Sequence, residues 1–331
     1  MLKKKLKDLL FEHNNNYGFD PLDLITGEYQ KFPNLSIIIP YYNTGTLVKK
    51  TIKHLYNSID LVLKTQPDWK YEVIVIDDGS NSHPLLSYKI DQTSSIKILI
   101  NKKNLGRSFT RQRGLENAIY DICLFLDSDV LIDKTQLLNH LKLHSVSSKL
   151  GLRNFICVSF FEFGDLNHHL LNYKQIIPSD LHLNDFRLHC HYGHTWVGCK
   201  EDQKFIGMNF NIVHDTNYFK DWEGMYYAWA LSNMVLGGLF SAHRRDCLKV
   251  GGFNLSFRGY GFTETTIVTK LIAINGNYVL PVLIGGGLHV ENPKINHTRA
   301  EKDVIFWRKH DLYFNKYLYL SEQEAINDIQ T

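Results

Sequence analysis

The chain has 331 residues, of which 44% are hydrophobic and 21% charged, as in an ordinary globular protein that buries one large core or two modest ones. A net charge of +3 is too small to indicate a nucleic-acid partner, and no apolar run approaches the length of a membrane span. The five cysteines are an odd number and widely spread, which favours reduced thiols in a cytoplasmic setting over a disulfide framework.

The N-terminal segment MLKKKLKDLLFEHNNN predicts an amphipathic helix within an extension formed by residues 1–33. Lysines surround one apolar face, which consists of Leu2, Leu6, Leu9 and Leu10. The segment has too little apolar length for a secretory signal. We expect this face to pack against the protein's own domain or a partner; the alternative is peripheral docking on the anionic inner face of a membrane.

Strand-like and helical segments alternate through the next hundred residues. Four β-rich runs are expected at 35–39 (ended by Pro40), 71–76, 96–100 and 122–126, with helices at 46–64 and about 108–120. This alternation predicts an α/β protein with a Rossmann-like, mostly parallel central sheet flanked by helices. Polar or acidic loops follow all four runs, so we expect them to meet at one edge of the sheet, where open α/β sheets bind ligands.

The run at 122–126 ends directly in Asp127, Ser128 and Asp129. Two carboxylates one residue apart at the end of a buried strand suit a hard divalent cation, and such a cation commonly also contacts substrate phosphates. For this tripeptide alone, a simple acidic turn that caps the next helix is the alternative interpretation.

The second half of the chain is less regular. Residues 155–163 predict a strand, whereas 179–220 are rich in His, Asn and Asp without clear periodicity. A cluster in this region suggests zinc, but its spacing fits no ligand pattern, so a structural or acceptor-loop role is favoured; it consists of His189, Cys190, His191, His194 and Cys199. Residues 294–331 are expected to form a helical tail.

Seven segments stand out along the sequence, in this order: NLSIIIPYYN, VIVIDDGS, NKKNLGRSFTRQRG, LFLDSD, a Gly-Gly segment, GYGFTETT and LHVENP. In this order and spacing they resemble the family 2 glycosyltransferases, the inverting enzymes of GT-A fold. The later segments resemble the galactosyltransferase-type C-terminal half of chondroitin-polymerase-like members. The resemblance covers about residues 34–293, with a nucleotide-sugar half at 34–135 and an acceptor and catalytic half at 150–293.

The resemblance implies a UDP-sugar donor, a carbohydrate or glycoconjugate acceptor, and a Mn²⁺ or Mg²⁺ ion held by Asp129 and His289. Tyr42 would lie against the base, Asp78 would accept a hydrogen bond from uracil, and Asp127 would approach the ribose. Arg111 would contact the base or a phosphate. The full set implied for the donor nucleotide is Pro40, Tyr42, Asp78, Arg111, Asp127 and Ser128. The set implied for the sugar or acceptor is Gly237, Gly238 and Trp229.

The family's general base comes from a Glu-Asp pair that opens a helix after a G-Y-G-like turn. Here Thr263 takes the place of the Glu and Glu264 that of the Asp, so the resemblance makes Glu264 the candidate base, one methylene longer than usual. Thr266 replaces a further acidic residue, and Gln112 stands where the family usually has Asn. These departures put the acceptor geometry in doubt more than donor binding.

We therefore expect a metal-dependent inverting glycosyltransferase in polysaccharide or glycoconjugate synthesis, cytoplasmic or peripheral at the inner face of a membrane. Two alternatives stay open. A glycosyltransferase-like subunit could bind nucleotide sugar without turnover. A nucleotidyltransferase would also need a metal and a parallel sheet, but it would usually carry a glycine-rich phosphate loop, of which PYYNTGT is a poor version.

Overall fold

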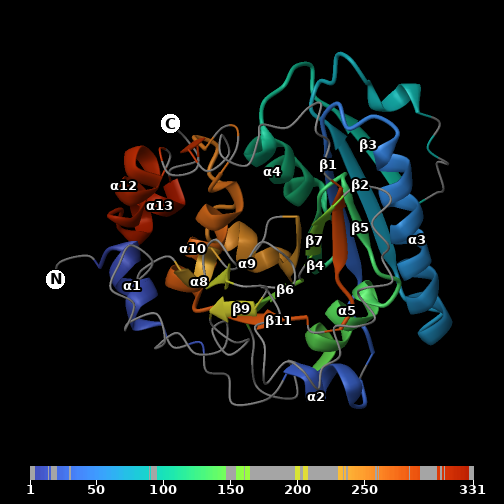
Figure 1. Ribbon diagram of the computed structural model, residues 1–331, viewed down its shortest axis with the longest axis horizontal. Helices are drawn as coiled ribbons and strands as arrows, with labels where there is room; N and C mark the ends of the chain where they lie inside the picture. The colour runs from blue at the N-terminus through green and yellow to red at the C-terminus, as the bar shows by residue number, and fades with distance from the viewer. Residues whose placement is uncertain are drawn as a thin grey trace.

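A computed structural model of the chain is built around a seven-stranded sheet in the order β11-β6-β10-β4-β1-β2-β3, with helices on both faces (Figure 1). β1 pairs in parallel with β2 and β4, β2 with β3, and β6 with β11, whereas β10 is antiparallel to β4 and β6. The strands are β1 (Leu35–Tyr41), β2 (Tyr71–Asp77), β3 (Ile96–Ile100), β4 (Ile122–Leu126), β6 (Phe155–Val158), β10 (Leu239–His243) and β11 (Tyr278–Pro281). The predicted α/β class with a mostly parallel sheet is confirmed.

The structure describes residues 4–88 apart from 14, 16–20 and 30; residues 90 and 95–146; 154–164 apart from 160; 198–201 and 204–207; 230–235 apart from 234; 238–290 apart from 258, 260 and 283; and 304–327 apart from 306, 307 and 309. The His/Cys cluster therefore lies outside the described residues except for Cys199, which falls in the hairpin of β8 (Gly198–Glu201) and β9 (Lys204–Gly207).

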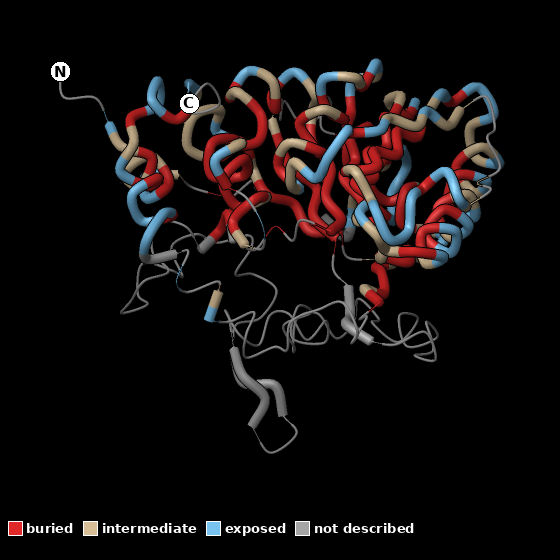
Figure 2. Tube along the Cα trace, turned by 90° about the horizontal axis from the view of Figure 1, so that it is seen from above, coloured by how far each residue is buried: buried red, intermediate tan, exposed pale blue. Residues whose placement is uncertain are grey.

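The sheet separates two apolar cores, and Figure 2 shows the buried residues running through the middle of the molecule. Side chains alternate along a strand, so Ile37 and Ile39 of β1 join the core on one face and Ile38 joins the core on the other. This two-sided burial is the reason why these strands are continuous apolar runs in the sequence.

Helices α3 (Leu47–Thr65) and α5 (Gln136–Val146) contribute side chains to one core. The other core takes side chains from α4 (Arg107–Asn117), α9 (Arg244–Lys249) and α10 (Thr263–Asn275). The shorter helices are α2 (Pro21–Thr26), η1 (Leu85–Ser87), α8 (Ala230–Asn233) and α13 (Glu322–Asn327).

Two predicted strand boundaries are wrong. β1 continues through Pro40 to Tyr41. Its pairing with β4 stops at Ile38, so the missing N–H of Pro40 removes no hydrogen bond to β4. The run at 155–163 is two strands rather than one: β6 belongs to the large sheet, and after Ser159 the chain enters a second, three-stranded sheet as β7 (Phe161–Gly164).

The three-stranded sheet has the order β5-β12-β7 and lies beside the carboxyl end of β4. β5 (Val130–Ile132) begins directly after Asp129, the last residue of the acidic turn. β12 (Gly287–Val290) pairs with β5 antiparallel, with His289 opposite Val130. The Val290 amide also donates to the Asp129 carbonyl at 2.9 Å. This pairing brings His289 to the acidic turn from a position far along the chain.

The two terminal segments pack together on α10 (Figure 1). Leu6 and Leu10 of α1 (Leu6–Glu12) are buried in the same core as α10, and the Leu6 amide donates to the Leu320 carbonyl at 2.9 Å. Two short helical segments, η6 (His310–Phe314) and α12 (Asn315–Leu318), complete this contact. Of the two placements predicted for the N-terminal helix, its own domain or a partner, the structure shows packing on its own domain through Leu6 and Leu10. Within the described residues, no helix combines the length and apolarity that a membrane crossing needs.

Candidate active site

The predicted site residues gather where the strand order of the large sheet reverses. The chain runs outward from β1 to β2 and β3 and then returns past β1 to β4, so β1 and β4 are neighbours at the point where the direction of the crossovers reverses. A crevice forms at the carboxyl ends of the strands at such a switch point. The β1 end carries Tyr42, and the β4 end carries the turn Asp127-Ser128-Asp129.

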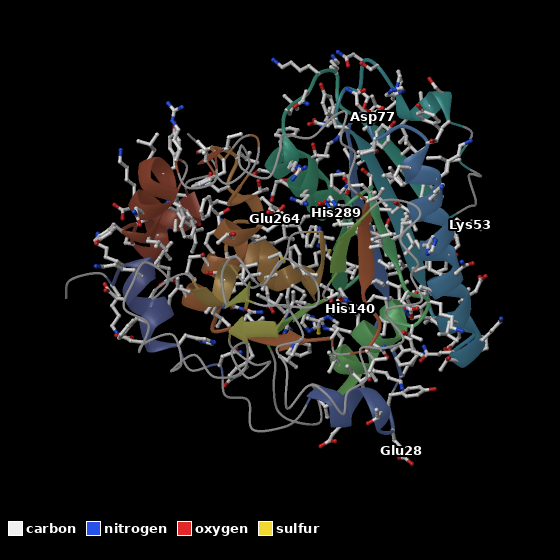
Figure 3. The ribbon with its side chains drawn as sticks, viewed as in Figure 1. Glu28, Lys53, Asp77, His140, Glu264 and His289 are labelled. Atoms are coloured by element: carbon white, nitrogen blue, oxygen red, sulfur yellow. The ribbon has the colours of Figure 1, made fainter. Side chains whose placement is uncertain are left out.

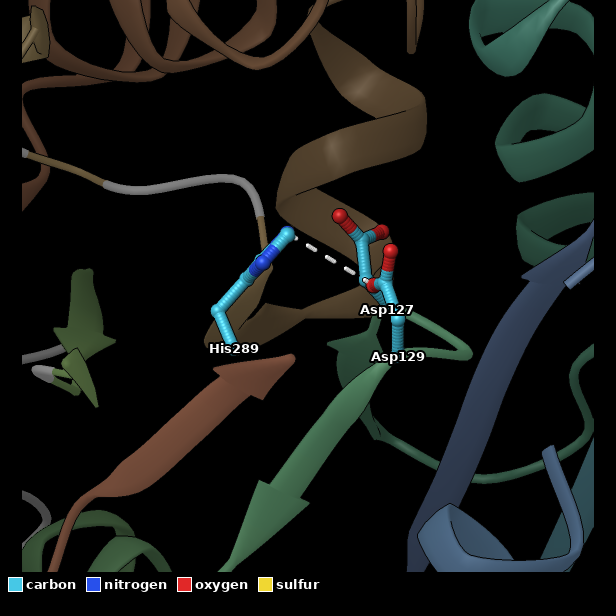
Figure 4. Close-up of side chains that lie close together, drawn as sticks. All are labelled: Asp127, Asp129 and His289. Carbon is cyan, nitrogen blue, oxygen red and sulfur yellow. Dashed lines mark ion pairs between the residues drawn. The ribbon is translucent and has the colours of Figure 1, made fainter. Parts of the chain in front are cut away.

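Asp127, Asp129 and His289 form a potential metal site (Figure 4). One ligand atom from each lies within 4.8 Å of the others, and His289 Nε2 is 3.6 Å from Asp129 Oδ1. All three side chains are only partly exposed. Carboxylate oxygens with one imidazole nitrogen suit Mn²⁺ or Mg²⁺, so the residues fit the predicted cation. Asp127 joins the predicted pair of Asp129 and His289.

Arg111 connects this site to Glu264. Its guanidinium is fully buried on α4 and forms ion pairs with Asp127 Oδ1 at 2.6 Å and with Glu264 Oε1. Glu264 lies in the first turn of α10 (Figure 3), and its side chain is 17% exposed. Within the described part of the chain, Arg111 is the one ion-pair partner of Glu264, and it contacts Oε1. The Arg111 guanidinium thus links the Asp127 carboxylate, on the metal side, to the carboxylate of Glu264, the predicted base.

The charges of this cluster are mutually stabilised. Burial works to lower the pKa of Arg111, but the negative charges of Glu264 and Asp127 outweigh it and leave that pKa above its ordinary value. Burial likewise works to raise the pKa of Asp127, and Arg111, Arg107 and His289 together hold it below its ordinary value. Asp127 is therefore a carboxylate at neutral pH, as a metal ligand must be.

Asp78 holds the loop after β3. Its Oδ1 accepts from the Asn101 side chain at 2.7 Å and the Leu105 amide at 2.9 Å, and its Oδ2 accepts from the Gly106 amide at 2.8 Å. A carboxylate oxygen has two acceptor sites, so Oδ2 retains capacity for one further donor such as a base N–H. Sequence reasoning missed the role of Asn101, although an Asn directly after a predicted strand is a signal for such a contact.

The other predicted donor residues differ in accessibility. Tyr42 is 43% exposed, which leaves its ring free to stack on a base. Pro40 is buried within β1, opposite Ile76. Ser128 is buried, with its hydroxyl 3.1 Å from the Thr44 hydroxyl and its carbonyl accepting from Thr51 at 2.8 Å. Ser128 therefore fastens the acidic turn to the β1–α3 loop.

Gln112 and Thr266, two of the residues that depart from the family pattern, each form a hydrogen bond in the structure. Gln112 Oε1 accepts from the Phe253 amide at 2.9 Å, and Thr266 donates to the Thr263 carbonyl at 2.9 Å. Gly238, predicted for the sugar or acceptor, accepts from the Asp127 amide at 3.0 Å through its carbonyl. Gly237 and Trp229 lie outside the described residues.

The comparison of the whole structure confirms the predicted class, an α/β protein of GT-A fold. A mannosyltransferase from Pyrobaculum calidifontis, solved with GDP-Man and Mn²⁺, superposes over 93% of this chain and 78% of its own, with a TM-score of 0.50 and 13% identity. The chain belongs to glycosyl transferase family 2, whose model matches residues 36–201, half of the sequence.

Curated relatives match over shorter stretches. An uncharacterized glycosyltransferase, YfnE, of Bacillus subtilis is 34% identical over 116 residues, which are 35% of this chain and 28% of the relative. A dolichyl-phosphate beta-glucosyltransferase of Dictyostelium discoideum is 29% identical over 137 residues, 37% of this chain and 41% of the relative. A poly-beta-1,6-N-acetyl-D-glucosamine synthase of Staphylococcus aureus is 27% identical over 101 residues, 30% of this chain and 23% of the relative. The matches thus span less than half the length of each relative.

Proposed function

We propose that this protein transfers a sugar from a UDP-sugar to an acceptor hydroxyl with inversion at the sugar carbon. The observation that carries the proposal is the Arg111 bridge, which holds the metal-side carboxylate of Asp127 and the carboxylate of Glu264 in one cluster at the switch point of the sheet. In a direct displacement the acceptor hydroxyl attacks the donor sugar in one step, so the donor site and the group that takes the proton must be adjacent.

The donor half is proposed to bind the nucleotide through Tyr42 and Asp78. The exposed Tyr42 ring can stack on the base, and the remaining acceptor site on Asp78 Oδ2 matches the single ring N–H of uracil. Asp127, Asp129 and His289 would hold a divalent cation, which when bound stabilises the negative charge that grows on the leaving diphosphate. The Mn²⁺ named for the Pyrobaculum structure supports the cation, and its GDP-Man supports a nucleotide-sugar donor; the preference for uracil rests on Asp78 and on the family resemblance.

The acceptor half is proposed to supply the general base. Arg111 contacts Glu264 Oε1, which leaves Oε2 to accept the proton of the attacking hydroxyl. The family match ends at residue 201, so the galactosyltransferase-type character of the C-terminal half also remains a proposal. Names such as the poly-N-acetylglucosamine synthase and the dolichyl-phosphate glucosyltransferase support an acceptor in polysaccharide or glycoconjugate synthesis.

The test replaces Glu264 with Gln, which keeps the shape of the side chain and removes its ability to take a proton. Nucleotide release from a panel of UDP-sugars with Mn²⁺ should fall by ~10²–10⁴-fold in Glu264→Gln, while UDP affinity stays near the wild-type value. Glu264→Asp is the matched control, because it restores a carboxylate with shorter reach and should keep part of the activity.

Wild-type transfer by Glu264→Gln would show that the base lies elsewhere. A second outcome concerns the wild-type protein itself. If it binds UDP-sugars tightly and transfers to no acceptor in a broad screen, it is a binding subunit, with Glu264 serving only as the ion-pair partner of Arg111.

A further inference from the structure

The residue before the proposed base helix has an unusual backbone. Phe262 immediately precedes α10 and has φ +60°, in the left-handed region, where a bulky side chain is rare. Gly259 and Gly261, just before it, also have positive φ, as glycine permits. Apart from Asn43, Phe262 is the one non-glycine residue with positive φ in the described part of the chain. Glycine would adopt this conformation more easily, so the ring of Phe262 must contribute something that offsets the strain.

The ring of Phe262 packs against the C-terminal tail. It is 1% exposed and stacks on Phe314 of η6, with centroids 4.6 Å apart and an interplanar angle of 19°. Phe314 is itself fully buried and lies 6.0 Å from the ring of Tyr317. The Tyr317 hydroxyl donates to the Thr266 carbonyl in the first turns of α10 at 3.3 Å. The tail therefore contacts the start of α10 through the Phe314 ring and the Tyr317 hydroxyl.

The same aromatic group reaches α4. Tyr317 meets Phe257 edge to face, with centroids 5.7 Å apart, and the Phe257 carbonyl accepts from the Ser108 hydroxyl at 2.9 Å. Ser108 is on the helix that carries Arg111. Glu264 is thus on a helix that the tail contacts directly, and Arg111 is on a helix that the tail reaches through Phe257.

We propose that Phe314 is a positioning residue for the transfer reaction: its stack on Phe262 holds the left-handed turn that directs Glu264 toward the acceptor. The inference rests on the proposed role of Glu264 as the base. It assigns a catalytic purpose to the C-terminal tail, which lies beyond the part of the chain that the family model matches.

The test combines Phe314→Ala with a rescue. Without the stack, Phe262 should leave the left-handed region, and kcat should fall by ~10–100-fold, the size of effect expected when a reacting group is misplaced by about 1 Å. Donor KM and UDP affinity should change less than about twofold, because Phe314 is linked to the donor side only indirectly, through Tyr317 and Phe257. Phe262→Gly in the Phe314→Ala background should restore most of kcat, since glycine holds the turn without a stack.

Hydrogen exchange gives a readout independent of activity. The Thr266 amide donates to the Phe262 carbonyl at 3.0 Å, so its protection should drop in Phe314→Ala and recover in the double variant. Leu318→Ala is the matched control: it removes a buried side chain from the same tail, one that does not stack on Phe262, and it should retain kcat.

Three results would overturn the inference: unchanged kcat in Phe314→Ala, no recovery in the double variant, or an equal loss in Leu318→Ala. If Glu264→Gln proves fully active, the proposed base is wrong, and the tail then has no base to position. The exchange data would in that case still report whether the stack holds the turn, so the two failures are distinguishable.

Discussion

Acidification should destabilise this protein through His140, which is buried between two serine hydroxyls. His140 of α5 is fully buried, with Nδ1 2.7 Å from the Ser241 hydroxyl and Nε2 2.6 Å from the Ser159 hydroxyl. Burial lowers its pKa to about 3. The lowered pKa keeps the ring uncharged at neutral pH. Each hydroxyl can donate to or accept from a ring nitrogen, so the two together satisfy the neutral imidazole.

The sign and the size of the effect follow from this pKa. In the unfolded chain an ordinary histidine takes a proton as the pH falls below about 6.5, whereas folded His140 does so only near pH 3. Its contribution to stability is therefore fully present above about pH 6.5 and is lost as the pH falls. The loss is about 2 kcal/mol at pH 5 and about 4 kcal/mol at pH 3. Burial also lowers the pKa of the neighbouring His144, which acts in the same direction.

The assay is urea unfolding at about pH 7.5 and pH 5 for the wild type and for His140→Asn, which cannot titrate in this range. The wild type should lose about 2 kcal/mol more than the variant between the two pH values. His83→Gln removes an exposed histidine and should leave the pH dependence intact. Parallel pH dependence in the wild type and His140→Asn would refute the reasoning, as would an NMR titration of the His140 ring with a midpoint near 6.5.

Three further outcomes concern the site. Removing a ligand by Asp129→Asn or His289→Ala should raise the Mn²⁺ concentration for half-maximal activity by at least about tenfold, and full activity in excess chelator would remove the metal from the mechanism. Calorimetric titration should show UDP binding at least about tenfold tighter than GDP, with the preference lost in Asp78→Asn; equal affinities in the wild type would mean that the uracil assignment is wrong. Arg111→Met leaves two carboxylates without their shared cation and should reduce the free energy of unfolding by about 3–5 kcal/mol, whereas near-wild-type urea stability would show that the bridge contributes little.

The local pattern of the sequence is sufficient to predict the strands that carry the donor-site residues. Apolar runs at 35–39, 71–76, 96–100 and 122–126 predict four strands. The inner strands are apolar because both faces of the sheet are covered there, whereas the edge strand β3 is only partly buried. Parallel strands present their carboxyl ends at one edge of a sheet, so the order of the runs along the chain also predicts that Asp127 and Asp129 lie at a ligand-binding edge.

Only the tertiary structure decided which buried polar and aromatic groups meet. Arg111 and Glu264 are 153 residues apart, and the side chains of His140 and Ser241 are 101 residues apart. Nothing local distinguishes a buried arginine in an ion pair from one on a solvated helix, and the Phe262–Phe314 stack depends on where the tail returns. Periodicity reports whether a side chain is buried. The partner it finds there is decided by strand order and by the packing of helices across the sheet, and these arise from contacts distant in the chain.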